Sequence, residues 1–164
     1  MGSYDFGKDE IVAWVKDNFP KGATCLDVGA CDGKWSRLLG DYLLMDAVEI
    51  FPMNIINHNL NEKYRNVFCG DVKDLEYEWY DLIIFGDVIE HMTVENAQKV
   101  LEYARPRCKD MIVAVPYLYS QGAEYGNPWE VHIQNDLTPE LFEERYKGFK
   151  TLIANSEYAY YSKL

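Results

Sequence analysis

The chain has 164 residues, of which 48% are hydrophobic and 26% charged, values typical of one globular domain with a single core. Its formal net charge of −11 argues against the basic surface that holds nucleic acid independently of sequence, and it disfavours anionic membranes. No apolar run has the length of a membrane span or the pattern of a secretory signal, so we expect a cytoplasmic protein with a small or cationic ligand.

The apolar residues follow two different periods along the chain, which together predict one α/β domain over 1–164. Helical spacing predicts a leading segment 1–20 with a helix at about 8–19, and further helices at 35–42, 53–60, 94–104 and 139–146. Short apolar runs predict strands at 24–28, 47–50, 67–69, 81–85, 111–115, 149–156 and 158–163. Alternation of strands with helices predicts a seven-stranded, mostly parallel sheet with helices on both faces, completed by a C-terminal antiparallel hairpin.

A glycine-spaced turn follows the first predicted strand, in the stretch Leu26–Gly33. Small residues there let the backbone approach a ligand closely, and the next helix presents unpaired N–H groups. Acidic residues follow this strand pattern at Asp27, Glu49, Asp71 and Asp87. Because ligands of open α/β sheets bind at the carboxyl ends of the strands, we expect these four carboxylates to gather at one site.

Four fragments in this order resemble the motifs of class I S-adenosylmethionine-dependent methyltransferases of the small-molecule type. They are the glycine turn, Val48-Glu49-Ile50, Cys69-Gly70-Asp71-Val72 and the run from Tyr80 to His91. The resemblance implies a Rossmann-like fold, S-adenosylmethionine as cofactor and S-adenosylhomocysteine as product. Cys31 stands where the family often has a glycine, so the backbone there must tolerate a Cβ. The cofactor-binding residues implied are Asp27, Gly29, Ala30, Gly33, Glu49, Ile50, Asp71, Val72 and Asp87.

The chemistry of such a cofactor suits these residue types. A ribose diol offers two donors that one carboxylate accepts, and Glu49 follows Asp27 at the spacing of a ribose-binding acid. The exocyclic amine of adenine suits Asp71, although Asp is also common in a turn after glycine. Asp87 is expected near the transferred methyl group, where a carboxylate favours the sulfonium cation. Asp27 is expected either to anchor the glycine loop or to contact the amino group of the cofactor.

The candidate catalytic residues are Asp87, His91 and His132. A base is required only if the acceptor loses a proton, and imidazole is the side-chain group that most often takes that role. Each histidine has a second interpretation, as a hydrogen-bonding residue of its loop. Glu90 beside His91 makes too small a cluster to predict a metal site, so no metal is expected.

Residues 116–137 form a long segment rich in Tyr, Gly, Asn and Pro, without a clear period. Such a loop in a small domain is typical of a lid or binding loop, so we predict that it belongs to the active site. Its aromatic residues either wall an acceptor pocket or cover the edge of the sheet; they are Tyr117, Tyr119, Tyr125 and Trp129.

The favoured function is transfer of a methyl group from S-adenosylmethionine to a small-molecule acceptor by in-line displacement. The alternative is a catalytically idle domain of the same fold that binds the cofactor or a partner protein. A nicotinamide-dependent oxidoreductase is disfavoured, because Cys31 and Lys34 occupy the second and third glycine positions of its phosphate-binding motif. The oligomeric state is left open, a dimer included.

Overall fold

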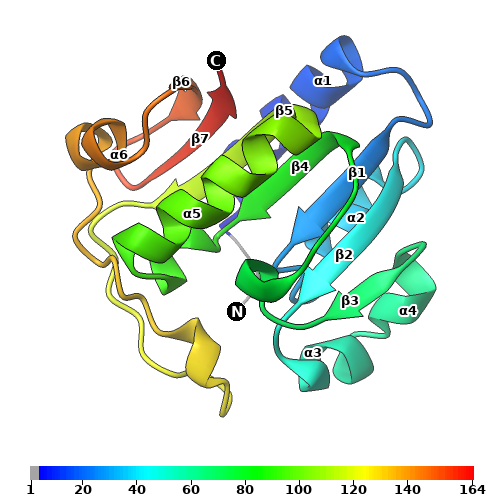
Figure 1. The fold of residues 1–164 in the computed structure, drawn as a ribbon, viewed down its shortest axis with the longest axis horizontal. Helices are drawn as coiled ribbons and strands as arrows, with labels where there is room; N and C mark the ends of the chain where they lie inside the picture. Colours follow the sequence, from blue (N-terminus) through cyan, green and yellow to red (C-terminus); the bar gives the residue numbers. More distant parts are fainter. Residues whose placement is uncertain (1–3) are drawn as a thin grey trace.

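The strands form one seven-stranded sheet in the order β3-β2-β1-β4-β5-β7-β6 (Figure 1). The computed structural model describes residues 4–164, so the first three residues of the predicted leading segment lie outside it. Within the sheet β7 runs antiparallel to both of its neighbours, and the other pairs are parallel, which confirms the predicted sheet and hairpin. The strands are β1 (Thr24–Val28), β2 (Leu44–Glu49), β3 (Val67–Cys69), β4 (Tyr80–Gly86), β5 (Cys108–Pro116), β6 (Phe149–Ala154) and β7 (Tyr158–Lys163).

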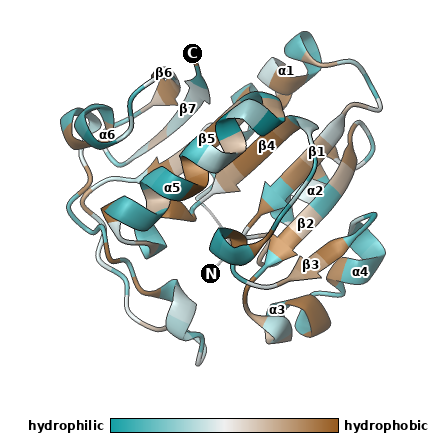
Figure 2. Cartoon of the chain, viewed as in Figure 1, coloured by the Kyte–Doolittle hydropathy of each residue, from teal (hydrophilic) through white to brown (hydrophobic). Residues whose placement is uncertain are grey.

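Helices cover both faces of the sheet, as predicted. Successive side chains of β4 alternate between the two hydrophobic cores that these helices form with the sheet. Ile83 and Phe85 pack into a core with α5, which lies in front of the sheet in Figure 1. Leu82 and Ile84 point to the opposite face and pack with α1 and α2. Figure 2 shows the central strands as hydrophobic. The helices are α1 (Lys8–Asn18), α2 (Lys34–Leu39), α3 (Pro52–Asn57), α4 (Leu60–Lys63), α5 (Val94–Ala104) and α6 (Pro139–Arg145), with 3₁₀ turns η1 (Val72–Asp74), η2 (Ile89–His91), η3 (Arg105–Arg107) and η4 (Pro128–Glu130).

Two local predictions differ from the structure. The single helix expected at 53–60 is divided into α3 and α4, because Asn59 adopts a left-handed conformation with φ 51° that ends helical geometry. The short β3 is the edge strand of the sheet, so Cys69, which belongs to a short apolar run of the sequence, is exposed and not part of the core. Neither difference moves the strand ends that carry the predicted site.

The strand order places a crevice between β1 and β4. The chain passes from β1 to β2 and β3 on one side, then returns to β4 on the other side of β1. Loops that leave β1 and β4 at their carboxyl ends therefore diverge, which is the position where open α/β sheets bind ligands.

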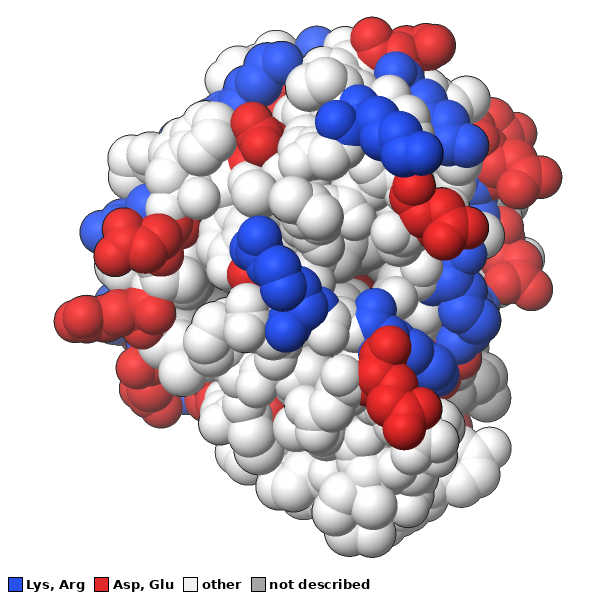
Figure 3. All heavy atoms as spheres, turned by 90° about the vertical axis from the view of Figure 1, so that its right-hand side faces the viewer, with Lys and Arg blue, Asp and Glu red and all other residues white. Residues whose placement is uncertain are grey.

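The surface beside β1 to β3 carries charges of both signs. Figure 3 shows Lys and Arg side chains interspersed with Asp and Glu side chains on this face. Among residues 4–164 no helix combines the length and the hydropathy that a membrane span requires.

Candidate active site

A cavity of about 830 Å³ opens at the carboxyl ends of β1, β2, β3 and β4. Its walls come from the loops that follow these strands and from the long segment 116–137, so the predicted active-site loop does face the same space as the glycine turn. A volume of this size falls in the range of pockets for small ligands and cofactors.

Most of the predicted site residues are brought together here. Asp27 and Gly33 do not line the cavity, and their side chains or backbone serve other contacts described below. The predicted residues that do line it are Gly29, Ala30, Glu49, Ile50, Asp71, Val72, Asp87, His91 and His132.

The glycine turn has a left-handed backbone that brings it against the loop after β4. Gly29 has φ 75°, and a Cβ added there would lie 2.7 Å from Cγ2 of Val88. Cys31 has φ 49°, so its backbone does adopt the left-handed region despite its Cβ. Gly33, with φ 79°, precedes α2, and a Cβ there would lie 2.9 Å from Cδ of Lys63. Gly33 therefore permits the packing of α2 against α4.

Substitution of Gly29 by alanine is expected to destabilise the fold, because the new Cβ meets both an unfavourable φ and the Val88 side chain. We expect the free energy of unfolding to fall by about 1–3 kcal/mol in urea denaturation. Gly122→Ala is the matched control, since nothing lies within 4 Å of its added Cβ, and it should stay within about 0.5 kcal/mol of the parent. Equal losses in the two variants would contradict this account of the turn.

Glu49 lies at the end of β2 and ties the glycine turn to the next loop. Its Oε2 accepts a hydrogen bond from the Cys31 N–H at 2.8 Å, and its Oε1 accepts one from the Phe51 N–H at 2.8 Å. The residue is 3% exposed, and burial raises the pKa of its carboxyl above the ordinary value while both N–H donors oppose that shift. Each oxygen keeps a further lone pair, so the carboxylate can still accept from a diol in the cavity.

Asp71 follows β3, and its position is compatible with both roles left open by the sequence, a turn residue and a ligand for the adenine amine. Its Oδ1 accepts a hydrogen bond from the Lys73 N–H at 3.0 Å, which is the turn-forming role. Its Oδ2 lies 3.2 Å from Nζ of Lys73, and the residue also lines the cavity. Asp71 thus stabilises η1 and offers a carboxylate edge to a ligand.

Asp27 points away from the cavity, toward the face covered by α1, α2 and α4. Its Oδ2 accepts a hydrogen bond from the Tyr64 hydroxyl at 2.5 Å, and Oδ1 has no hydrogen-bond partner among residues 4–164. The residue is 1% exposed, and burial raises the pKa of its carboxyl to about 7. The alternation of β1 explains the direction, because Leu26 and Val28 occupy the opposite face.

The raised pKa of Asp27 predicts a pH-dependent stability. Its contribution is present below the unfolded pKa of about 3.9 and is lost as the pH rises through about 7, since burial opposes the charged form. The free energy of unfolding of Asp27→Asn should therefore rise relative to that of the parent as the pH increases from 4 to 7. The difference should reach up to about 4 kcal/mol at pH 8. Denaturation curves at several pH values test this, with the exposed Asp9→Asn as control. A difference that does not change with pH would contradict it.

Asp87 ends β4 in a left-handed conformation with φ 56° and lines the cavity. Its Oδ1 accepts a hydrogen bond from the Tyr158 hydroxyl at 2.6 Å, whereas Oδ2 is buried without a hydrogen-bond partner among residues 4–164. Burial raises the pKa of Asp87, and Tyr158 and Lys8 oppose the shift. One carboxylate oxygen is therefore left for a ligand at the end of β4.

Sequence reasoning missed Lys8 and Tyr4 as neighbours of the site. Lys8 is 5% exposed, and its Nζ lies 4.1 Å from the ring centroid of Trp35, with burial lowering its pKa to about 8. Tyr4 lines the cavity, and its hydroxyl donates to Glu157 at 3.2 Å. A lysine beginning an amphipathic helix carries no sequence signal of burial, because such positions are usually solvated.

The loop 116–137 is fastened to η2 by backbone hydrogen bonds. The carbonyl of Glu90 accepts from the N–H of Ile133 and from that of Gln134, each at 2.9 Å. Of the four aromatic residues named above, three line the cavity and Tyr125 does not, its exposure being 84%. Those three support the interpretation of an acceptor pocket; they are Tyr117, Tyr119 and Trp129.

His91 of η2 and His132 of the loop 116–137 lie next to each other in the wall of the cavity. Their ring centroids are 4.7 Å apart with an interplanar angle of 77°. Burial, and then the neighbouring His132, lower the pKa of His91 to about 4, so its imidazole is neutral at pH 7. The Glu90 carboxyl, buried next to them, has a pKa raised well above its ordinary value by burial and then by Asp87.

Comparison with solved structures shows that the whole chain shares one fold with several methyltransferases. An S-adenosylmethionine-dependent methyltransferase from Clostridium acetobutylicum superposes with a TM-score of 0.74 at 14% identity, covering 98% of this chain and 92% of its own. Magnesium protoporphyrin IX methyltransferase from Synechocystis, with S-adenosylmethionine bound, gives 0.66 at 16% identity, covering 100% and 86%. The chain has the fold of S-adenosylmethionine-dependent methyltransferases.

A third structure with this fold shows the range of its acceptors. The 1,6-didemethyltoxoflavin-N1-methyltransferase from Burkholderia thailandensis, with its acceptor and S-adenosylhomocysteine bound, gives a TM-score of 0.67 at 15% identity, covering 97% of this chain and 78% of its own. No family model and no curated protein matches the sequence. The predicted resemblance is therefore confirmed at the level of the methyltransferase fold.

Proposed function

We propose that the protein binds S-adenosylmethionine and transfers its methyl group to a small-molecule acceptor, releasing S-adenosylhomocysteine. The observation that carries this proposal is the convergence of Glu49, Asp71 and Asp87 on one cavity at the carboxyl ends of the parallel strands β2, β3 and β4. Solved structures with the same fold hold S-adenosylmethionine or S-adenosylhomocysteine, which supports the choice of cofactor.

The adenosine and the sulfonium of the cofactor each have a proposed counterpart among these residues. Glu49 would accept from the ribose hydroxyls, and Asp71 from the exocyclic amine of adenine, with the backbone of Val72 alongside. Gly29, Ala30 and Ile50 give close backbone approach to the rest of the adenosine. Asp87, with its unpartnered Oδ2, would lie near the sulfonium, whose positive charge that oxygen favours.

The reaction itself needs chiefly orientation. A lone pair of the acceptor attacks the methyl carbon as the bond from that carbon to sulfur breaks, and the sulfonium becomes a neutral thioether. Fixing acceptor and methyl group in line can supply roughly 7–11 kcal/mol of the barrier reduction. If the acceptor carries a proton, Asp87, His91 or His132 would receive it. Tyr117, Tyr119 and Trp129 would hold the acceptor.

The test is calorimetric titration of the protein with S-adenosylmethionine and with NAD, followed by incubation with a panel of hydroxyl, amine and thiol acceptors. We expect saturable binding of S-adenosylmethionine alone, and formation of S-adenosylhomocysteine with at least one acceptor class. Binding without turnover on any acceptor would support the idle cofactor-binding domain instead. Binding of NAD in place of S-adenosylmethionine would overturn the proposal.

A further inference from the structure

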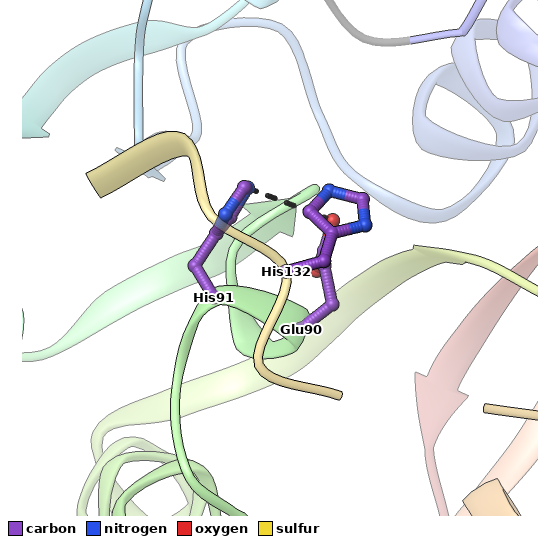
Figure 4. Close-up of side chains that lie close together, drawn as sticks. All are labelled: Glu90, His91 and His132. Atoms are coloured by element: carbon purple, nitrogen blue, oxygen red, sulfur yellow. Dashed lines mark ion pairs between the residues drawn. The ribbon is translucent and has the colours of Figure 1, made fainter. Parts of the chain in front are cut away.

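Three side chains with metal-ligating chemistry meet on one wall of the cavity. Glu90 and His91 belong to η2, and His132 comes from the loop fastened over it (Figure 4). One ligand atom from each residue lies within 4.8 Å of the others, and Nε2 of His91 is 3.9 Å from Oε1 of Glu90. Because all three residues line the cavity, an ion held by them would face its interior.

The hydrogen bonds of the two histidines leave one nitrogen of each ring available. Nδ1 of His91 lies 3.2 Å from the carbonyl oxygen of Val131, and Nδ1 of His132 lies 2.8 Å from that of Tyr119. A carbonyl oxygen can only accept, so we assign the ring proton to Nδ1 in both residues. The lone pair of each neutral imidazole is then on Nε2, as in histidines that bind metals.

Glu90 supplies an independent indication that a ligand is required. The residue is 0% exposed, and neither carboxylate oxygen has a hydrogen-bond partner among residues 4–164. A buried carboxylate that stays charged is paired with a cation or bound to a metal, because desolvation of an isolated charge is costly, and without such a partner the group takes up a proton. Oδ2 of Asp87 is also buried and unpartnered among those residues, which adds a second carboxylate nearby.

We propose that Glu90, His91 and His132 bind a divalent first-row transition-metal ion at the acceptor end of the cavity. Two imidazoles with one carboxylate are the ligand set of catalytic Zn²⁺ sites and of non-haem Fe²⁺ sites. Three protein ligands leave coordination positions open, and these would face the acceptor. The proposal departs from the sequence-based expectation of no metal, because the fold brings the distant His132 to Glu90 and His91.

The role of the ion rests on the proposed function. An acceptor hydroxyl bound to the metal would lose its proton to solvent more easily, since a divalent cation lowers the pKa of a bound oxygen. The resulting oxyanion forms a bond to the methyl carbon while the carbon–sulfur bond breaks. S-adenosylmethionine and an alcohol thus give S-adenosylhomocysteine, a methyl ether and one proton. The structure therefore favours oxygen acceptors, with no need for a histidine base.

Titration of the chelator-treated protein with Zn²⁺, Mn²⁺ and Co²⁺ alone tests the site. We expect one ion per chain by calorimetry, with electron paramagnetic resonance of bound Mn²⁺ and visible absorption of bound Co²⁺ reporting the same site. His91→Gln and His132→Gln should each weaken binding by about 100-fold or more, since outer-sphere changes alone cost up to about 100-fold. His58→Gln is the matched control, because His58 lies at the end of α3 and does not line the cavity.

Titration with S-adenosylhomocysteine in the same samples separates this proposal from the proposed function, and circular dichroism spectra show that each variant is folded. Ion binding lost in the two histidine variants but kept in His58→Gln supports the metal site, whether or not S-adenosylhomocysteine binds. Saturable binding of S-adenosylhomocysteine, with no binding of any of the three ions to the parent protein, would overturn the metal site and leave the proposed function standing. Equal ion affinity in parent and His132→Gln would also overturn it.

Discussion

Replacement of Glu49 by glutamine is expected to weaken binding of S-adenosylmethionine by about 10- to 100-fold. The variant would remove the charge from the two hydrogen bonds proposed between Glu49 and the ribose, and such charge-assisted bonds are each worth about 1.5–3 kcal/mol. It also disturbs the glycine turn, because an amide has one oxygen for the two N–H donors of Cys31 and Phe51 that the carboxylate accepts. Calorimetric dissociation constants for parent and variant measure the loss.

Two controls make this result specific. Glu95→Gln removes a carboxylate from the exposed surface of α5, where it pairs with Lys99 at 2.7 Å, and it should leave the dissociation constant unchanged. S-adenosylhomocysteine should lose as much affinity as S-adenosylmethionine in Glu49→Gln, since both carry the same ribose. An unchanged dissociation constant in Glu49→Gln would remove the ribose assignment.

Replacement of Asp87 by asparagine is expected to act differently on the two forms of the cofactor. S-adenosylmethionine carries a sulfonium and S-adenosylhomocysteine a neutral thioether, so a lost carboxylate charge costs the former alone. A charge pair about 6 Å apart at an effective dielectric constant near 20 is worth about 3 kcal/mol, and partial solvation reduces this to about 1–3 kcal/mol. The ratio of the two dissociation constants should therefore shift by about 5- to 100-fold against S-adenosylmethionine.

The ratio controls for damage to the fold in this variant. Asparagine keeps an oxygen that can accept from the Tyr158 hydroxyl, so the left-handed turn at the end of β4 has its tie to β7 in both proteins. A structural disturbance would weaken both ligands together and leave their ratio constant. That outcome would place the sulfonium away from Asp87.

The fold was predictable because most strands appear in the sequence as short apolar runs bounded by turn-forming residues. The predicted bounds of β1, β3 and β7 agree with the structure. β2 begins at Leu44, three positions before the predicted start. The predicted start is late because Asp46 interrupts the apolar run in the sequence. In the sheet Asp46 nevertheless pairs in register with Leu26, and Arg65 satisfies its charge at 2.8 Å. The periodicity of apolar residues cannot predict such a partner on a distant loop.

The site was predictable only in part, for a related reason. Acidic residues at strand ends are ordered by the sheet, so Glu49, Asp71 and Asp87 converge as expected. Asp27 sits within β1, and its direction depends on strand alternation, which turns it toward Tyr64. The meeting of His132 with His91 depends on an irregular loop that is held by the backbone of Glu90, and no local pattern specifies such contacts.

A crystal structure of the protein with S-adenosylhomocysteine bound tests the central claim most directly. The account predicts the adenosine at the carboxyl ends of β1, β2 and β3, with the ribose hydroxyls within hydrogen-bond distance of Glu49 and the sulfur beside Asp87. The ligand seated elsewhere on the molecule, or seated in this cavity with its ribose turned away from Glu49, would contradict it.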